Sequence, residues 1–138
     1  MSEPQIRVGI GVMIWKDGKV LLGKRKGSRG SGEYGFPGGA LQYGETLETC
    51  ANRETREECG ITLNNLRPRF VLDIDHYPPT HWVHVGFIAD WASGEATVLE
   101  PEKCEGWGWY ELDQLPTPLF APNKKMIEAF RTGTTLIE

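Results

Sequence analysis

The first 26 positions have the apolar and polar pattern of a β-hairpin. Residues 6–15 form an apolar run rich in β-branched side chains, residues 16–18 (KDG) have the composition of a tight turn, and apolar and polar residues alternate over positions 19–26. The next stretch contains seven glycines between Gly27 and Gly44, which predicts a loop without regular structure. Two interpretations of this loop stay open: a flexible surface segment, or a backbone that approaches a ligand where side chains would obstruct it.

A helical pattern begins after Thr46, which suits an N-cap, and ends before Gly60, which suits the position after a last turn. The helix is therefore predicted over residues 47–59. Strands are predicted over residues 68–77, 81–91 and 106–112, and a second helix follows with Asn123 as its cap and Gly133 as its end. This order predicts one α/β layered domain with a mixed sheet over residues 1–138.

Charge and composition narrow the range of partners. The formal net charge is −4 and no block of like charge resembles a nucleic-acid-binding arm, so we expect no nucleic-acid polymer as a partner. The apolar runs are too short for a membrane span, the polar start lacks a signal-peptide core, and we expect a cytoplasmic protein with no membrane partner. Three cysteines without metal-ligand spacing predict reduced, packed thiols. A phosphorylated small molecule bound through divalent cations fits this balance.

The inner face of the predicted 47–59 helix turns acidic toward its end, because three glutamates continue its apolar stripe: Glu54, Glu57 and Glu58. Arg53 is placed to pair with Glu57, but one arginine cannot neutralise three convergent carboxylates. Mg²⁺ is the physiological cation that suits an all-oxygen site. The alternative is an exposed acidic helix end, neutralised by arginines and water.

Residues 39–61 (GALQYGETLETCANRETREECGI) match the pattern Gx5Ex7REUxEExGU, in which U is a bulky apolar residue. Every fixed position agrees: Gly39, Glu45, Arg53, Glu54, Glu57, Glu58 and Gly60. Thr55 is the one departure, since the pattern prefers an apolar residue there, and it puts local packing in doubt more than chemistry. The segment resembles the Nudix box of the MutT-like Nudix hydrolases. The flanking segments LLGKRKGSRG and EPEKCEGWGWYELDQLP are similar to the cytosolic nucleotide-pyrophosphatase branch of plants and animals.

The resemblance implies the Nudix α/β/α sandwich with a mixed β-sheet. It also implies a Mg²⁺-dependent or Mn²⁺-dependent hydrolase that converts nucleoside triphosphates to nucleoside monophosphates and pyrophosphate, and so removes modified nucleotides. ADP-ribose, nucleotide sugars, dinucleoside polyphosphates and prenyl diphosphates are the alternative substrates. A nucleotide-sensing domain without turnover is the alternative of another class, although such a domain would be expected to lose box carboxylates. A homodimer is suggested by the resemblance alone.

Site roles also follow from the resemblance. Glu54 and Glu58 would be the principal metal ligands, the Gly39 carbonyl a backbone ligand, and Glu57 a further ligand or the group that orients the attacking water. The resemblance does not say whether Glu57 or Glu58 is the catalytic base. Arg53 would orient the carboxylates, and Glu45 would brace the loop.

Some relatives add a carboxylate from a later segment, for which Glu105 is preferred here over Glu102. Four residues outside the box are candidates for substrate binding: Tyr34, Phe36, His81 and Trp82. For each aromatic ring taken alone, packing in the core or on the sheet is the more common use.

Overall fold

The protein is described by a computed structural model that covers residues 3–27 and 29–137, the side chain of His76 excepted. The chain opens with the predicted hairpin, in which β1 (Gln5–Lys16) pairs antiparallel with β2 (Lys19–Arg25). Asp17 and Gly18 join the two strands with φ angles of 51° and 76°. Two successive positive φ values are the geometry of a type I′ turn, which matches the twist of a hairpin.

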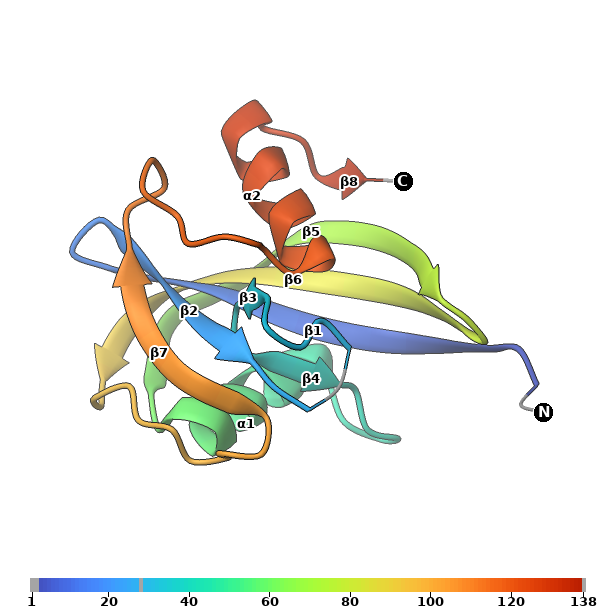
Figure 1. The fold of residues 1–138 in the computed structure, drawn as a ribbon, viewed down its shortest axis with the longest axis horizontal. Helices are drawn as coiled ribbons and strands as arrows, with labels where there is room; N and C mark the ends of the chain where they lie inside the picture. The colour runs from blue at the N-terminus through green and yellow to red at the C-terminus, as the bar shows by residue number, and fades with distance from the viewer. Residues whose placement is uncertain (1–2, 28, 138) are drawn as a thin grey trace.

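The strands of the described chain form one mixed sheet (Figure 1). Its main path runs β3 (Tyr34–Gly35), β2, β1, β6 (Thr80–Ser93), β5 (Thr62–Tyr77) and β8 (Leu136–Ile137). β4 (Gly38–Ala40) pairs with β1, and β7 (Cys104–Tyr110) pairs with β2. β1 and β6 run parallel, as do β5 and β8, whereas the other pairs are antiparallel.

Two helices cover opposite faces of this sheet, α1 (Leu47–Cys59) on one side and α2 (Ala121–Thr132) on the other (Figure 1). Alternate residues of β1 face the two layers. Ile10, Val12 and Ile14 belong to the core that includes α1, and Met13 belongs to the core that includes α2. The predicted α/β/α sandwich with a mixed sheet is therefore confirmed.

Two local predictions were wrong. The glycine-rich stretch is not irregular throughout, because it contains β3 and β4. Asn123 does not cap the second helix, which starts at Ala121 with Phe120 in the N-cap position and no side-chain cap. Pro122 in the first turn favours this earlier start, since proline suits the first helical positions.

The predicted bounds of α1 are confirmed, and the three cysteines are free and buried, as expected. In the described part of the chain, no helix is long and apolar enough to cross a membrane.

Candidate active site

Helix α1 carries Glu54, Glu57 and Glu58, which we call the acidic cluster. Local contacts fix both ends of the helix. The Thr46 hydroxyl accepts a hydrogen bond from the Thr49 N–H at 3.0 Å, and Gly60 ends the helix with a φ of 72°. The buried face contains Cys50, Ala51, Glu54, Thr55 and Cys59. Thr55 is fully buried, and its hydroxyl donates to the Ala51 carbonyl at 2.8 Å, so a polar residue is accommodated on this face.

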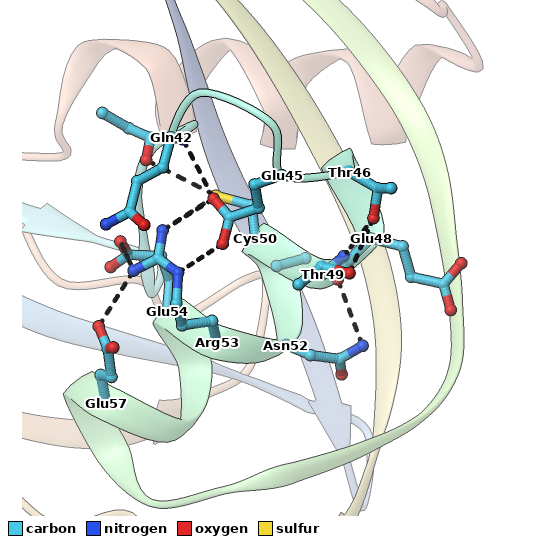
Figure 2. A network of polar contacts seen from close by, with 12 residues as sticks. Gln42, Glu45, Thr46, Glu48, Thr49, Cys50, Asn52, Arg53, Glu54 and Glu57 are labelled. Atoms are coloured by element: carbon cyan, nitrogen blue, oxygen red, sulfur yellow. Dashed lines mark hydrogen bonds and ion pairs between the residues drawn. The ribbon is translucent and has the colours of Figure 1, made fainter.

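Arg53 connects three glutamates (Figure 2). It binds Glu45 through two bonds, Nε to Oε2 at 2.6 Å and Nη2 to Oε1 at 3.0 Å. Its Nη1 donates to Glu54 at 2.9 Å and to Glu57 at 3.1 Å. These hydrogen bonds raise the pKa of Arg53 and hold the pKa of Glu45 at about 2. Glu45 also accepts from the Gln42 N–H at 3.1 Å, which ties the loop before α1 to the helix.

Glu54 and Glu58 lie against the backbone of β4. The Gly38 N–H donates to Glu58 Oε2 at 2.8 Å. A Cβ atom on Gly39 would lie 2.4–2.6 Å from the three carboxyl atoms of Glu54, so that carboxylate occupies the space that a side chain would need. Gly38 is just as constrained, since its Cβ would lie 1.9 Å from the Ile10 carbonyl oxygen of β1. The two glycines therefore allow the acidic helix to meet the sheet.

Burial raises the pKa of both inward carboxyls. For Glu54, burial is the main cause, partly offset by the Arg53 charge. For Glu58, the pKa is raised to about 8, mainly by burial and also by the charges of Glu54 and Glu100, while the Gly38 hydrogen bond opposes the rise. Two carboxyls with raised pKa values at one point are typical of a site that binds a cation or moves a proton.

The metal-ligand prediction of three convergent carboxylates agrees only partly with this geometry. Glu57 is half-exposed and held by Arg53, whereas Glu54 and Glu58 face the cavity. Within residues 3–27 and 29–137, no three acidic, histidine or cysteine side chains form a ready-made metal cluster. The two inward carboxylates and the neighbouring Gly39 backbone are nevertheless hard oxygen donors of the kind that Mg²⁺ accepts, so the residues present fit a divalent cation.

A cavity of about 590 Å³ extends from these carboxylates along the sheet. Glu54, Glu58, Gly38 and Gly39 line one end. Phe36, Trp82, His84, Phe120 and Asn123 also line it, at the edge of the α2 layer. This size and mixed lining are typical of a small-molecule site.

The structure separates the four candidate substrate residues into two pairs. Phe36 and Trp82 are buried and line the cavity. Tyr34 does not line it and instead packs edge-on against Tyr110, with ring centroids 6.3 Å apart. His81 lies on the opposite face of β6 from Trp82, and its Nε2 lies 2.9 Å from Asp73 Oδ1. Only the first pair is therefore placed to meet a ligand of this cavity.

Glu105 also lies outside the cavity, half-exposed, with its carboxylate 3.9 Å from Lys24 Nζ. Glu100, which the sequence reasoning missed, is better placed. Its Oε1 is buried without a hydrogen bond, 3.7 Å from Lys103 Nζ, and it lines a small adjoining cavity together with Glu58. The acidic segment before β7 drew attention to this region, but spacing alone did not distinguish its members.

His84 and Asn123 were also missed as cavity residues. The His84 ring lies across two glycines of β1: Nδ1 is 3.0 Å from the position of a Cβ on Gly9, and Nε2 is 2.7 Å from that on Gly11. The pKa of His84 is lowered to about 4, mainly by burial and also by the charges of nearby arginines, so the ring is neutral. Asn123 Oδ1 accepts from the Phe36 N–H at 2.9 Å.

Comparison with known proteins agrees with this geometry. The NUDIX domain family matches residues 5–130. The chain is 35% identical over 113 residues to the NAD-capped RNA hydrolase NudC of Chromobacterium violaceum, covering 82% of this chain and 41% of that protein. It is 37% identical to the NudC of Photorhabdus laumondii, covering 82% of this chain and 42% of that protein. The chain thus spans less than half the length of these relatives.

Among solved structures, a MutT NUDIX hydrolase from Burkholderia pseudomallei has 41% sequence identity and a TM-score of 0.85, covering 90% of this chain and 97% of that one. These relatives are bacterial, so the expected similarity to the plant and animal branch is not supported. The box residues, the fold and the family match agree, and the chain belongs to the Nudix hydrolase family.

Proposed function

We propose that this chain is a Mg²⁺-dependent nucleotide pyrophosphohydrolase that converts nucleoside triphosphates to nucleoside monophosphates and pyrophosphate, with modified nucleotides among its substrates. One observation carries the proposal. The carboxylates of the buried Glu54 and the partly buried Glu58 meet the glycine backbone of β4 at one end of a cavity that also holds aromatic and cationic side chains. Metal-held phosphates at the carboxylates and a nucleoside beside Phe36 and Trp82 account for both parts of the cavity.

Glu54 and Glu58 would hold the cation, with the Gly39 carbonyl and Glu57 as further ligands. A bound divalent cation supplies charge neutralisation for the phosphates and activation of water. Arg53 keeps one oxygen of Glu54 in place, and the Gly38 N–H does the same for Glu58. Glu57 and Glu58 are the two candidates to accept the proton of the attacking water. The sequence alone favoured Glu105 as the additional carboxylate from a later segment. In this proposal Glu100 has that role, because it lies beside Glu58.

The charges in the cavity help to rank the alternative substrates. Arg7, Arg25 and Arg29 all line it, and an apolar prenyl chain would gain nothing from such neighbours. ADP-ribose and nucleotide sugars stay as alternatives. Dinucleotides of the NAD type are the second candidate, because the curated relatives are named as NAD-capped RNA hydrolases. A nucleotide-sensing role without turnover is disfavoured because Gly39, Arg53, Glu54, Glu57 and Glu58 are all retained.

We further propose that the described residues act as one catalytic domain in the cytoplasm, and that two copies associate. Sedimentation equilibrium over a range of protein concentrations tests the dimer. A mass equal to one chain throughout would contradict it.

The function is tested by turnover of a panel containing ordinary and modified nucleoside triphosphates, NAD, ADP-ribose and nucleotide sugars, with Mg²⁺ or with EDTA. We expect Mg²⁺-dependent release of pyrophosphate from at least one triphosphate. If only NAD or ADP-ribose were turned over, the assignment of the catalytic residues would stand, but the proposed substrate class would be wrong. No turnover of any compound would favour the sensing role.

A further inference from the structure

The cavity contains a cluster of positively charged side chains. Arg7, Arg25 and Arg29 line it, and in the described part of the chain no carboxylate lies within 4.0 Å of their guanidinium nitrogens. Glu58 and Glu33 influence Arg25 only from beyond that distance. We call these three arginines, with Trp82 and Phe120, the arginine lobe.

Aromatic rings hold the three guanidinium groups. Arg29 Cζ lies 4.2 Å from the centroid of the Trp82 ring and Arg7 Cζ lies 5.0 Å from it. Arg25 Cζ lies 3.8 Å from the Phe120 centroid, and its Nε donates to the Arg29 carbonyl at 3.0 Å. Stacking orients a guanidinium without using its N–H groups, so most donors of the lobe remain available to a ligand.

The three cations also repel one another. Burial lowers the pKa of Arg25, and the charge of Arg29 lowers it further. Burial lowers the pKa of Arg29 too; Tyr77 opposes this effect, and the charge of Arg7 adds a smaller lowering of its own. An anion bound among them would relieve both the repulsion and the desolvation. Phosphate oxygens are the acceptors that clustered arginines match best.

The lobe and the acidic cluster line the same cavity, so one ligand can reach both. The acidic cluster would bind the phosphoanhydride through a cation, whereas the arginines of the lobe can bind an anion without one. We propose that the arginine lobe binds a second phosphate of the substrate, attached to the sugar away from the phosphoanhydride, either as a monoester or as the phosphodiester to a further nucleotide. This inference rests on the proposed function, since it takes the acidic cluster as the site of the phosphoanhydride.

Ligands without an anhydride test the lobe independently of catalysis. For each of the four common bases, isothermal titration calorimetry in EDTA would compare the nucleoside 5′-monophosphate, the nucleoside 3′,5′-bisphosphate and the 5′-phosphorylated dinucleotide. We expect at least one of the latter two to bind tenfold or more tightly than the monophosphate, with a gain that shrinks as salt rises. Tighter binding of the bisphosphate would indicate that the substrate is a small nucleotide with a second phosphate monoester. Tighter binding of the dinucleotide would indicate that the substrate is the end of a nucleotide chain.

The variant R7Q/R29Q should lose this gain and keep the affinity for the monophosphate. R69Q is the matched control, because Arg69 also stacks on a ring, 4.9 Å from the Phe70 centroid, but does not line the cavity. Thermal melting checks that both variants fold. Equal affinities for all three ligands with every base, or a gain that survives R7Q/R29Q, would overturn the inference. A wild-type protein that releases no pyrophosphate from any triphosphate overturns the proposed function instead, whatever the binding data show.

Discussion

Replacing Gly39 with alanine tests how the acidic helix is seated on the sheet. The added Cβ would lie 2.4 Å from the Glu54 carboxyl carbon, and contacts below 3.0 Å do not persist, so the two groups must separate by about 0.6 Å or more. Gly39 has no positive φ angle, and alanine therefore adds no backbone strain. The change acts on the Glu54 carboxylate, which Arg53 holds at 2.9 Å.

Two magnitudes follow from this displacement. Overpacking of this kind costs about 1–3 kcal/mol of unfolding free energy. A misplacement near 1 Å within a catalytic group can reduce the rate roughly 100-fold. We therefore expect G39A to stay folded, with a lower melting temperature, and to lose roughly two orders of magnitude in kcat.

Steady-state kinetics with Mg²⁺ titration measures the loss. G106A is the control, because a Cβ on Gly106 meets no atom within 4 Å and its φ angle is not positive. In a double-mutant cycle, E54Q should cost much less activity in the G39A background than in wild type, because both changes damage the same carboxylate. Wild-type kcat in folded G39A, or additive losses in the cycle, would refute the reasoning.

Three further predictions concern single side chains. Without metal, the pKa of Glu58 is raised from 4.5 to about 8, so its contribution to stability is complete below pH 4.5 and is lost as pH rises through 8. In EDTA, E58Q should therefore flatten the fall in melting temperature over this range, and an unchanged slope would contradict the burial argument. E100Q should lower kcat roughly tenfold, and E105Q should leave kcat unchanged. A loss of kcat in E105Q but not in E100Q would favour Glu105, the residue preferred from the sequence alone. N123A should cost about 1–3 kcal/mol in urea unfolding because the buried Phe36 N–H loses its acceptor, and an unchanged unfolding midpoint would contradict that role.

Local signals were sufficient for α1 and its ends. Thr46 and Gly60 act within one turn of the helix, and the 3.6-residue period placed Glu54 on its buried side. Periodicity placed Glu57 on the same inner face and placed Arg53 to pair with it, and the structure contains this pair. The helical projection did not show that the paired Glu57 stays half-exposed outside the cavity.

The rest of the cavity depends on contacts between distant segments. Asn123 meets Phe36 across 87 positions, and a cap is the more obvious use for an asparagine before a helix. His84 reaches Gly9 because β1 and β6 pair in parallel with these two residues in register. Neither the pairing nor the register can be read from one strand alone. Glu105 lies in β7 and Glu100 lies before that strand, and only the folded chain shows that Glu100 is the one that shares a cavity with Glu58.

The central claim is that the Glu54 and Glu58 pair supports metal-dependent cleavage of a nucleoside triphosphate. It is tested most directly by measuring pyrophosphate and orthophosphate from the preferred triphosphate, with wild type and E58Q, in Mg²⁺ and in EDTA. The account predicts pyrophosphate as the product of wild type with Mg²⁺, and almost none in EDTA or with folded E58Q. Turnover by E58Q near the wild-type rate, or pyrophosphate release unaffected by EDTA, would contradict it.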